Sequence, residues 1–221
     1  MRSKWLGLIL VLCSVATRAE SLVVTPAEMQ QWEEHRFAGS TRYTLVEMDG
    51  REALQAQCAA GEASGRYLRR SIDLTETPVL EWSWRVDDVL DGVDERTRDG
   101  DDYPARVYVV YEHRVLRWRT RALNYVWASE QPAGSDWPNA FARQAHMIAV
   151  RSGEPDAPGW FREQRNVRED FRRYHGRDID EIQVVAIMTD CDNAGQALEG
   201  WYGRIRFLSE DQADLERHRE N

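Results

Sequence analysis

Residues 100–111 read GDDYPARVYVVY: an acidic turn runs into a segment in which polar and apolar side chains alternate. Alternation with a period of two is typical of a strand that buries one face and exposes the other. The phrases ALNYVWAS at 122–129 and VVAIMTDCDNAG at 184–195 have the same form, with charged or amide side chains within or directly after the strand. Polar groups held in this way against a rigid sheet indicate a site.

Similar alternating runs recur along the chain, and turn signals such as Asp49-Gly50 and Thr77-Pro78 separate them. We predict strands at 43–48, 53–58, 67–74, 79–86, 106–111, 115–118, 122–127, 146–151, 183–189 and 201–208. Many short strands with little helix favour two packed sheets. The predicted fold class is therefore all-β: a two-sheet antiparallel sandwich, jelly-roll-like, with one or two short helices.

Two segments carry helix signals. The stronger lies at 167–174, where Asn166 provides an N-cap and Gly176 a left-handed end. A shorter helix is predicted at 26–35, where a threonine cap precedes a proline in the first turn. The final residues, 210–221, are charged throughout, and we expect this tail to fray.

The N-terminal residues have the form of a secretory signal peptide. A basic start is followed by a mostly apolar stretch at 5–15 and by a small residue, Ala19, at the expected cleavage point. The apolar stretch is shorter than the roughly 20 residues of a membrane span, so we expect an exported protein, periplasmic or extracellular, that does not span the membrane. We assign 1–19 to the signal peptide, 20–209 to a single β-sandwich domain and 210–221 to the charged tail, because about 200 residues suit one domain.

Acidic residues outnumber basic ones. The chain has 29 Lys and Arg against 38 Asp and Glu, and loss of Arg2, Lys4 and Arg18 with the signal peptide leaves 26 basic residues and a net charge of −12. Nucleic acid is not an expected partner, because phosphate binding needs a basic surface. Two cysteines remain, Cys58 and Cys191, which form a disulfide if their strands adjoin in an oxidising compartment, or stay as two buried thiols.

The connection at 87–102 concentrates acidic side chains. Such a cluster repels itself unless a cation, an arginine or a sugar hydroxyl satisfies it. One interpretation is a divalent-ion or polyol site centred on Asp99, Asp101 and Asp102. The alternative is a solvated loop that neighbouring arginines partly neutralise.

The segment 190–195 begins like a calcium loop, with oxygen ligands at its first and third positions and glycine at its sixth. It is not an EF-hand, because Ala194 and Trp201 stand where further ligands belong. A structural turn whose Asp and Asn side chains bond their own backbone is one interpretation; a hard cation shared with the acidic loop is the other. With Ca²⁺ as the ion considered, the candidate ligands are Asp99, Asp101, Asp190 and Asp192.

Aromatic residues supply a second kind of candidate. Along 122–127, Asn124 faces one side of the strand while Tyr125 and Trp127 face the other. Two aromatic rings spaced in this way form a platform that can stack on a sugar, or else they fill the core. Arg106, if buried, needs a carboxylate partner. The candidate ligand-binding residues are Asp101, Asp102, Arg106, Asn124, Tyr125, Trp127, Asp190, Asp192 and Asn193.

Six phrases spread along the chain are familiar together: ASG at 63–65, LEWSWRV at 80–86, GDDYPARVYVV at 100–110, LNYVWAS at 123–129, RNVREDF at 165–171 and MTDCDNAG at 188–195. They resemble a bacterial family of exported proteins known as domain of unknown function 3047, from residue 32 to residue 208. The resemblance implies one domain in the bacterial envelope, and it implies no activity and no catalytic residue. The family often has a small or hydroxyl residue at the position of Cys191, which favours unpaired thiols.

Three hypotheses on function follow. The favoured one is a non-enzymatic module that binds a glycan or another polyol through acidic, amide and aromatic groups. A carbohydrate-active hydrolase or lyase is the first alternative, because such chemistry needs two carboxylates close in space and no fixed sequence motif. The second is an envelope scaffold whose loops at Trp137 and Trp160 dock a partner protein. The common-site hypothesis requires the acidic phrases and Arg106 to meet at one end or on one face of the sandwich.

Overall fold

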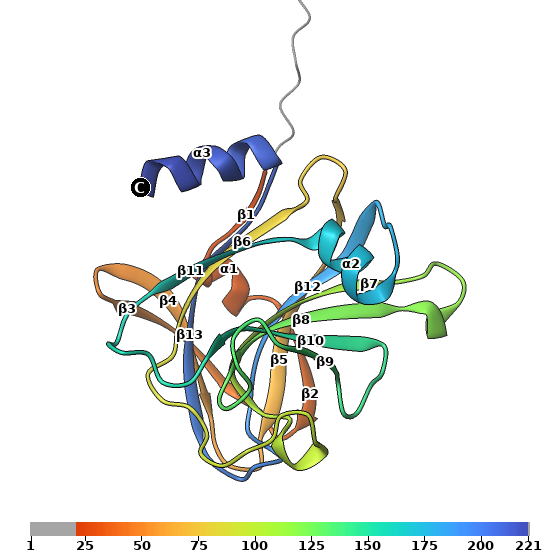
Figure 1. Cartoon of the computed structure of the whole chain (residues 1–221). Helices are drawn as coiled ribbons and strands as arrows, with labels where there is room; N and C mark the ends of the chain where they lie inside the picture. The colour runs from red at the N-terminus through yellow and green to blue at the C-terminus, as the bar shows by residue number, and fades with distance from the viewer. Residues whose placement is uncertain (1–20, 221) are drawn as a thin grey trace, which may run out of the picture.

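The computed structural model describes residues 21–220, and Figure 1 shows two β-sheets packed face to face, with short helices at their margins. The predicted signal peptide at 1–19 lies outside the described residues. The predicted fold class, a jelly-roll-like two-sheet sandwich, is confirmed.

One sheet has six strands, all paired antiparallel. Its order is β11-β6-β13-β4-β3, and β1 pairs with β13 beside this path. The strands are β1 (Leu22–Val24), β3 (Arg42–Met48), β4 (Arg51–Cys58), β6 (Val79–Arg85), β11 (Phe161–Asn166) and β13 (Leu198–Leu208).

The other sheet has seven strands in the order β2-β5-β12-β7-β8-β10-β9. One pairing departs from the predicted antiparallel pattern, because β8 and β10 run parallel. The chain reverses twice between them: β9 pairs antiparallel with the far edge of β10 and so lies outside it. The strands are β2 (Glu33–Ala38), β5 (Ala63–Asp73), β7 (Tyr103–Tyr111), β8 (Arg121–Ala128), β9 (Asp136–Pro138), β10 (Ala145–Ser152) and β12 (Glu181–Asp190).

The strands that sequence reasoning missed lie mostly at sheet edges. The sequences of β2, EEHRFA, and β11, FREQRN, are polar on both faces, so they lack the alternation that marks a strand with one buried face. The predicted strand at 115–118 is wrong: this segment lies in the loop between β7 and β8, which contains the short 3₁₀ turn η2 (Arg117–Arg119).

The core lies between the sheets and is rich in aromatic side chains. The ring of Trp82 on β6 stacks on that of Tyr125 on β8, with centroids 5.3 Å apart, and Trp84 meets Trp127 at 5.9 Å. All four side chains are buried. Rings of this size dominate the apolar area that the sandwich removes from water.

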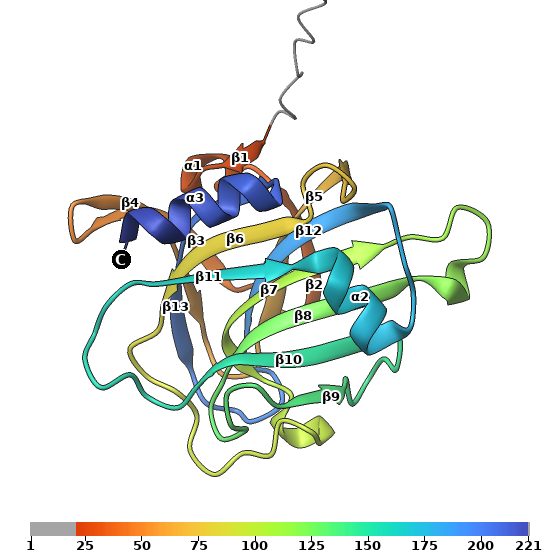
Figure 2. The same ribbon diagram turned by 45° about the horizontal axis from the view of Figure 1, so that its top comes forward.

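The helices lie at the margins of the two sheets (Figure 2). α2 (Val167–His175) is confirmed with its caps: Asn166 Oδ1 accepts a hydrogen bond from the Glu169 N–H at 3.0 Å, and Gly176 has φ 60°. α1 (Pro26–Gln30) is shorter than the predicted 26–35, because the chain from Glu33 onward pairs with β5.

The C-terminal segment forms α3 (Glu210–Glu220), so the expectation that it frays is wrong. Ala213 is buried against Val79 and Leu208, and Glu216 pairs with Arg162 and Arg206. Ser209 and Gln212 cap the first turn through reciprocal hydrogen bonds. Among residues 21–220, none of the helices has the length and hydropathy to cross a membrane.

Cys58, at the end of β4, and Cys191, directly after β12, form a disulfide with their Cα atoms 6.2 Å apart. The bond joins the two sheets at one end of the sandwich. The expectation of unpaired thiols is therefore wrong, because strand ends that lie 133 residues apart in the sequence are neighbours in the fold.

Candidate functional site: a pocket on the outer face of the seven-stranded sheet

A pocket of about 390 Å³ opens on the face of the seven-stranded sheet that points away from the core. Its floor comes from alternate residues of the central strands, and the loop at 139–142 forms one wall. The lining residues are Phe37, Ala63, Asp101, Arg106, Tyr108, Ala122, Asn124, Asn139, Phe141, Ala142, Ala145, Met188, Asp190, Asp192 and Asn193.

An ion pair between Arg106 on β7 and Asp190 on β12 lies at the centre of this floor. Arg106 Nη2 donates to Asp190 Oδ2, and the guanidinium lies 4.6 Å from the centroid of the Tyr103 ring. Both residues are buried, with exposed fractions of 7% and 3%. Arg106 Nε and Asp190 Oδ1 nevertheless have no hydrogen-bond partner among the described residues. Unpaired buried polar atoms are costly, so these two atoms mark a place where a ligand or water is needed.

Burial raises the pKa of the Asp190 carboxyl to about 8, against the opposing attraction of Arg106. The nearby charges of Asp101, Asp102 and Asp192 act in the same direction as burial. Burial also raises the pKa values of Asp101 and Asp192. The single positive charge of Arg106 thus lies near more carboxyl groups than it can neutralise. Bound protons or a cation must neutralise the remaining negative charge.

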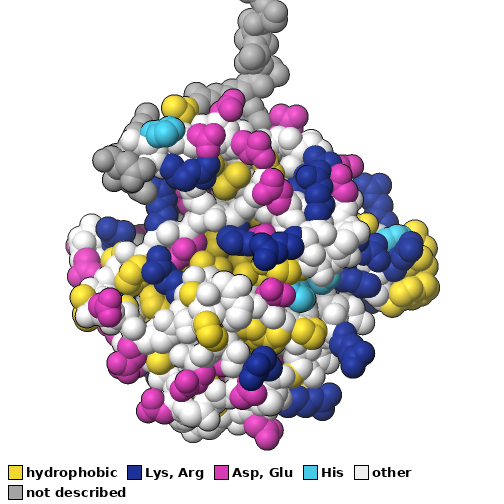
Figure 3. Space-filling model, viewed as in Figure 1, with side chains coloured by type: hydrophobic (Ala, Val, Ile, Leu, Met, Phe, Trp, Pro, Cys, Tyr) yellow, Lys and Arg dark blue, Asp and Glu magenta, His cyan; other side chains and the backbone are white. Residues whose placement is uncertain are grey.

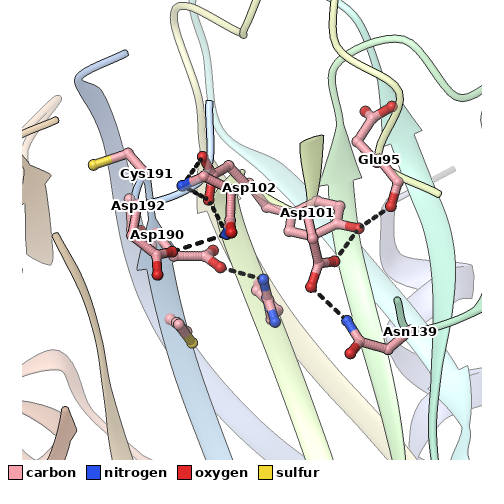
Figure 4. A network of polar contacts seen from close by, with 12 residues as sticks. Glu95, Asp101, Asp102, Asn139, Asp190, Cys191 and Asp192 are labelled. Atoms are coloured by element: carbon pink, nitrogen blue, oxygen red, sulfur yellow. Dashed lines mark hydrogen bonds and ion pairs between the residues drawn. The ribbon is translucent and has the colours of Figure 1, made fainter. Parts of the chain in front are cut away.

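Asp101 is held from two sides (Figure 4). The Tyr103 hydroxyl donates to Asp101 Oδ1 at 3.0 Å, and Asn139 Nδ2 donates to Asp101 Oδ2 at 2.7 Å. Asn139 Oδ1 in turn accepts from the backbone N–H groups of Phe141 and Ala142 at 3.0 and 2.9 Å. This chain of hydrogen bonds fixes the loop that carries Phe141 beside the pocket.

Asp102 has a structural role next to the pocket. Its carboxylate accepts hydrogen bonds from the backbone N–H of Asn193 at 3.0 Å, from Asn193 Nδ2 at 3.0 Å and from the Ala194 N–H at 2.5 Å. The turn after β12 is therefore held by a residue from the acidic loop, where the sequence had suggested local Asp and Asn bonds within the turn itself. Asp102 and this turn position Asp192 and Asn193 at the pocket wall.

A cation could be held by three of these carboxylates. Asp102, Asp190 and Asp192 each offer an oxygen within 4.8 Å of the others, which is close enough to share a hard cation. This set differs from the predicted one. Asp99 is exposed and does not belong to the group, and neither does Asp101.

Tyr125 and Trp127 do not form a ligand platform. Alternation along β8 turns them toward the six-stranded sheet, where both are buried in the core. The Tyr125 hydroxyl donates to Asp170 at 2.9 Å, and Trp127 Nε1 donates to the Gly153 carbonyl at 2.9 Å. Of the three candidates predicted on β8, only Asn124, on the opposite face of the strand, lines the pocket.

The aromatic side chains that do reach the pocket were missed from the sequence. Phe37 on β2 is 60% exposed and Phe141 is 53% exposed. The ring of Phe141 lies 5.1 Å from the Arg98 guanidinium, and the ring of Phe37 lies 4.6 Å from that of His35. A lone phenylalanine in the polar run EEHRFA was the signal that could have identified Phe37.

The acidic loop is ordered by a residue that was not singled out, Glu95. Its side chain is buried, and Oε1 accepts from the backbone N–H groups of Ser129 and Glu130 at 2.6 and 3.0 Å. Its carbonyl oxygen accepts from Trp137 Nε1 at 3.1 Å. Nearby, Arg96 pairs with Asp94, as the solvated-loop alternative anticipated.

Neither tryptophan of the scaffold hypothesis presents a free ring. Trp137 is buried beneath the acidic loop, bonded to Glu95. Trp160 is half-buried, with the Arg51 guanidinium 5.3 Å from its ring centroid. The prediction that Trp137 belongs to an exposed docking surface is therefore wrong, because its loop folds back onto the body of the protein.

The fold brings together most of the acidic phrases. Asp101, Arg106, Asp190, Asp192 and Asn193 line one pocket, and Asp102 supports it from behind. They come from β7, from the end of β12 and from the loops that follow or precede these strands. Asp99, Tyr125 and Trp127 lie elsewhere.

Several solved structures are similar to this chain. A family 11 carbohydrate-binding module from Clostridium thermocellum, in complex with a β-1,3-1,4-mixed-linked tetrasaccharide, has 8% identity and a TM-score of 0.44, with 86% of this chain and 95% of that chain covered. A family 30 carbohydrate-binding module of a cellulosomal cellulase from the same organism has 11% identity, a TM-score of 0.43 and coverages of 86% and 99%.

A third structure, the glycoside hydrolase domain of Endo-D from Streptococcus pneumoniae R6, has 11% identity and a TM-score of 0.40 over 80% of this chain. The match spans only 22% of the length of that protein. No curated protein matches the sequence. A family model, in contrast, matches residues 30–206, most of the chain. The protein therefore belongs to the family described as "Protein of unknown function (DUF3047)".

Proposed function

We propose that the pocket on the outer face of the seven-stranded sheet binds a sugar or another polyol, and that the protein is a non-enzymatic binding module. The observation that carries this proposal is the pair of unpartnered atoms at its floor, Arg106 Nε and Asp190 Oδ1. Arg106 Nε is a donor, and Asp190 Oδ1 accepts when the carboxyl is ionised and can also donate when it is protonated. A hydroxyl group donates and accepts at once, so neighbouring hydroxyls of a polyol can satisfy both.

The walls of the pocket suit the rest of such a ligand. Phe37 and Phe141 offer exposed ring faces, which can pack against the apolar C–H face of a sugar ring. Asn124 adds an amide, which can donate to one hydroxyl and accept from another. A mostly apolar cleft with a few fixed polar groups is typical of small-molecule sites.

A carbohydrate-active hydrolase or lyase is the second candidate, and the raised pKa of Asp190 favours it. Glycoside hydrolysis needs one protonated carboxyl and a second, ionised one across the scissile bond. In this pocket Asp190 is paired with Arg106, and Asp101 accepts hydrogen bonds at both oxygens. These partners fit positioning better than proton transfer, and we therefore favour binding.

Export to the periplasm or the cell exterior is part of the same proposal. It rests on the N-terminal sequence, which lies outside the described residues, and on the Cys58–Cys191 disulfide. Disulfides persist in oxidising compartments and are rare in reducing ones.

The test is a thermal-unfolding screen with a panel of oligosaccharides, each with EDTA and with CaCl₂, followed by calorimetric titration of any saccharide that raises Tm. A ligand at about 100 times its Kd stabilises the native state by about 2.7 kcal/mol. The expected result is a rise in Tm that Phe141→Ala and Asn124→Ala each reduce. Trp118→Ala, which removes an exposed ring that does not line the pocket, serves as the matched control and should retain binding.

Two outcomes would count against the proposal. If no saccharide shifts Tm or gives heat under either condition, the polyol site loses its support. If a saccharide is shortened during incubation and Asp190→Asn stops this while folding is retained, the hydrolase or lyase is the better account. A shift that appears only with CaCl₂ would add a cation at Asp102, Asp190 and Asp192 to the polyol site.

A further inference from the structure

The loop at 112–120 between β7 and β8 projects beyond the body of the sandwich. In Figures 1 and 2 it is the green hairpin that extends from the seven-stranded sheet, with the turn η2 near its end. Val115 is 80% exposed and Trp118 is 68% exposed there. Trp118 is the only tryptophan with a largely exposed side chain in the described part of the chain. An apolar tip of this kind, held away from the protein, indicates a surface that another phase or molecule covers.

Arginines surround these apolar side chains. Arg114, Arg117 and Arg119 are exposed on the loop, and Arg117 and Arg119 form no ion pair with any described residue. Figure 3 shows the same arrangement, with yellow and dark blue side chains gathered at the projecting edge. The pKa of Arg121, at the base of the hairpin, is lowered by burial and by the like charges of Arg177 and Arg119. The tip is thus locally basic, although the whole chain has a net charge of −9.

We propose that this tip docks on an anionic membrane surface. Trp118 and Val115 enter the headgroup region, where the amphipathic indole is stable, and the arginines contact lipid phosphates. Interfacial side chains sit about 5–10 Å deep in that region. A projecting hairpin can reach this depth while the acidic body stays clear of the negative surface. The tip then acts as a peripheral anchor, independent of the pocket and its proposed ligand.

The charge and the convex shape of the tip together favour an anionic lipid surface over an acidic groove of a protein. The basic groups, the Trp118 ring and Val115 lie on one small convex tip, and a convex tip contacts a flat surface without a matching cavity. With so few apolar side chains, binding should be weak and reversible and should fall as salt screens the arginines. That salt sensitivity is measurable.

The experiment is co-sedimentation of the purified protein with vesicles of phosphatidylcholine alone and of phosphatidylcholine with phosphatidylglycerol at equal amounts. Binding to the mixed vesicles only is expected, with weaker binding at high salt. Arg117→Gln and Arg119→Gln should each reduce the partition coefficient by on the order of fivefold. Trp118→Ser should reduce it further. Arg204→Gln and Leu215→Ser, exposed residues outside the hairpin, are matched controls and should bind like the wild type.

A second measurement locates the Trp118 ring relative to the bilayer. Lipids brominated on the acyl chain should quench part of the tryptophan fluorescence of the wild type, and this part should vanish in Trp118→Phe. Binding that is equal for both vesicles, or that tip variants leave unchanged at retained Tm, would overturn the proposal. Absence of vesicle binding together with Trp118-dependent capture of an envelope protein would overturn it in favour of a protein partner, and displacement by free glycerol phosphate at millimolar concentration would point to a soluble anion.

Discussion

The two faces of the seven-stranded sheet carry side chains of opposite kind on the same strands. On β8, Tyr125 and Trp127 point into the core, whereas Asn124 points outward into the pocket. On β7, Val107 and Val109 point inward and Arg106 outward. The inner face is closed by a second sheet and carries apolar side chains together with polar tips that are hydrogen-bonded in the core, such as that of Tyr125. The outer face is covered by loops, and it keeps a buried ion pair in which two polar atoms have no hydrogen-bond partner among the described residues.

This contrast predicts that removing a ring from the inner face lowers the free energy of unfolding much more than removing a ring at the surface. Trp127→Ala removes a buried ring and should lower the free energy of unfolding by about 3–5 kcal/mol. Trp118→Ala, the same substitution at an exposed ring, should change it by no more than about 0.5 kcal/mol. Urea denaturation measures both; similar losses in the two variants would contradict the assignment of inner and outer faces.

The ion pair on the outer face should behave as a coupled unit. Arg106→Met leaves Asp190 buried without its cation and should cost about 3 kcal/mol at pH 8, and less at pH 5, where the carboxyl is protonated. Arg106→Met combined with Asp190→Leu should recover most of that loss, because no unpaired charge remains. Denaturation at both pH values tests this. A double variant less stable than the single one would show that the pair stabilises the fold directly.

The raised pKa of Asp190 also predicts that the stability of the fold depends on pH. Its pKa is raised to about 8, above the unfolded value, so between about pH 4 and pH 8 the native state holds a proton that the unfolded state has released. Stability should therefore fall as pH rises through this window, by up to about 1.4 kcal/mol per pH unit. Asp190→Asn removes this slope, so the difference between the two curves, measured in EDTA, isolates it. Parallel curves would mean that Asp190 is ionised in the native protein throughout.

The smallest stability effect belongs to the rim of the pocket. Phe141→Ala removes a half-exposed ring and should change the free energy of unfolding by about 0.5 kcal/mol or less. Saccharide affinity should nevertheless fall about tenfold, since one stacked ring contributes about 1–1.5 kcal/mol. A large stability loss with unchanged affinity would place Phe141 among the structural residues.

Much of the sandwich could be predicted because alternation is a local signal. The buried strands β7, β8 and β12 each show it, and the caps of α2 are written in Asn166 and Gly176. The edge strand β2 could not be found in this way, because its neighbours bury neither face completely. The helix α3 was missed because its sequence is a charged run: one alanine, Ala213, is buried, and Glu216 pairs with arginines of β11 and β13 that the local sequence does not reveal.

The site was only partly predictable, for a related reason. Alternation tells that Asn124 and Tyr125 face opposite sides, but it does not tell which side another sheet covers. The platform was therefore assigned to the wrong face. Contacts between distant segments, such as Cys58 with Cys191 or Arg106 with Asp190, follow from strand order, which no single stretch of sequence contains.

The most direct test is a crystal structure of the protein soaked with the saccharide that gives the largest rise in Tm. We expect ligand hydroxyls within hydrogen-bond distance of Arg106 Nε and Asp190 Oδ1, with a sugar ring against Phe141 or Phe37. A saccharide bound on the six-stranded sheet, with the pocket holding only water, would contradict it.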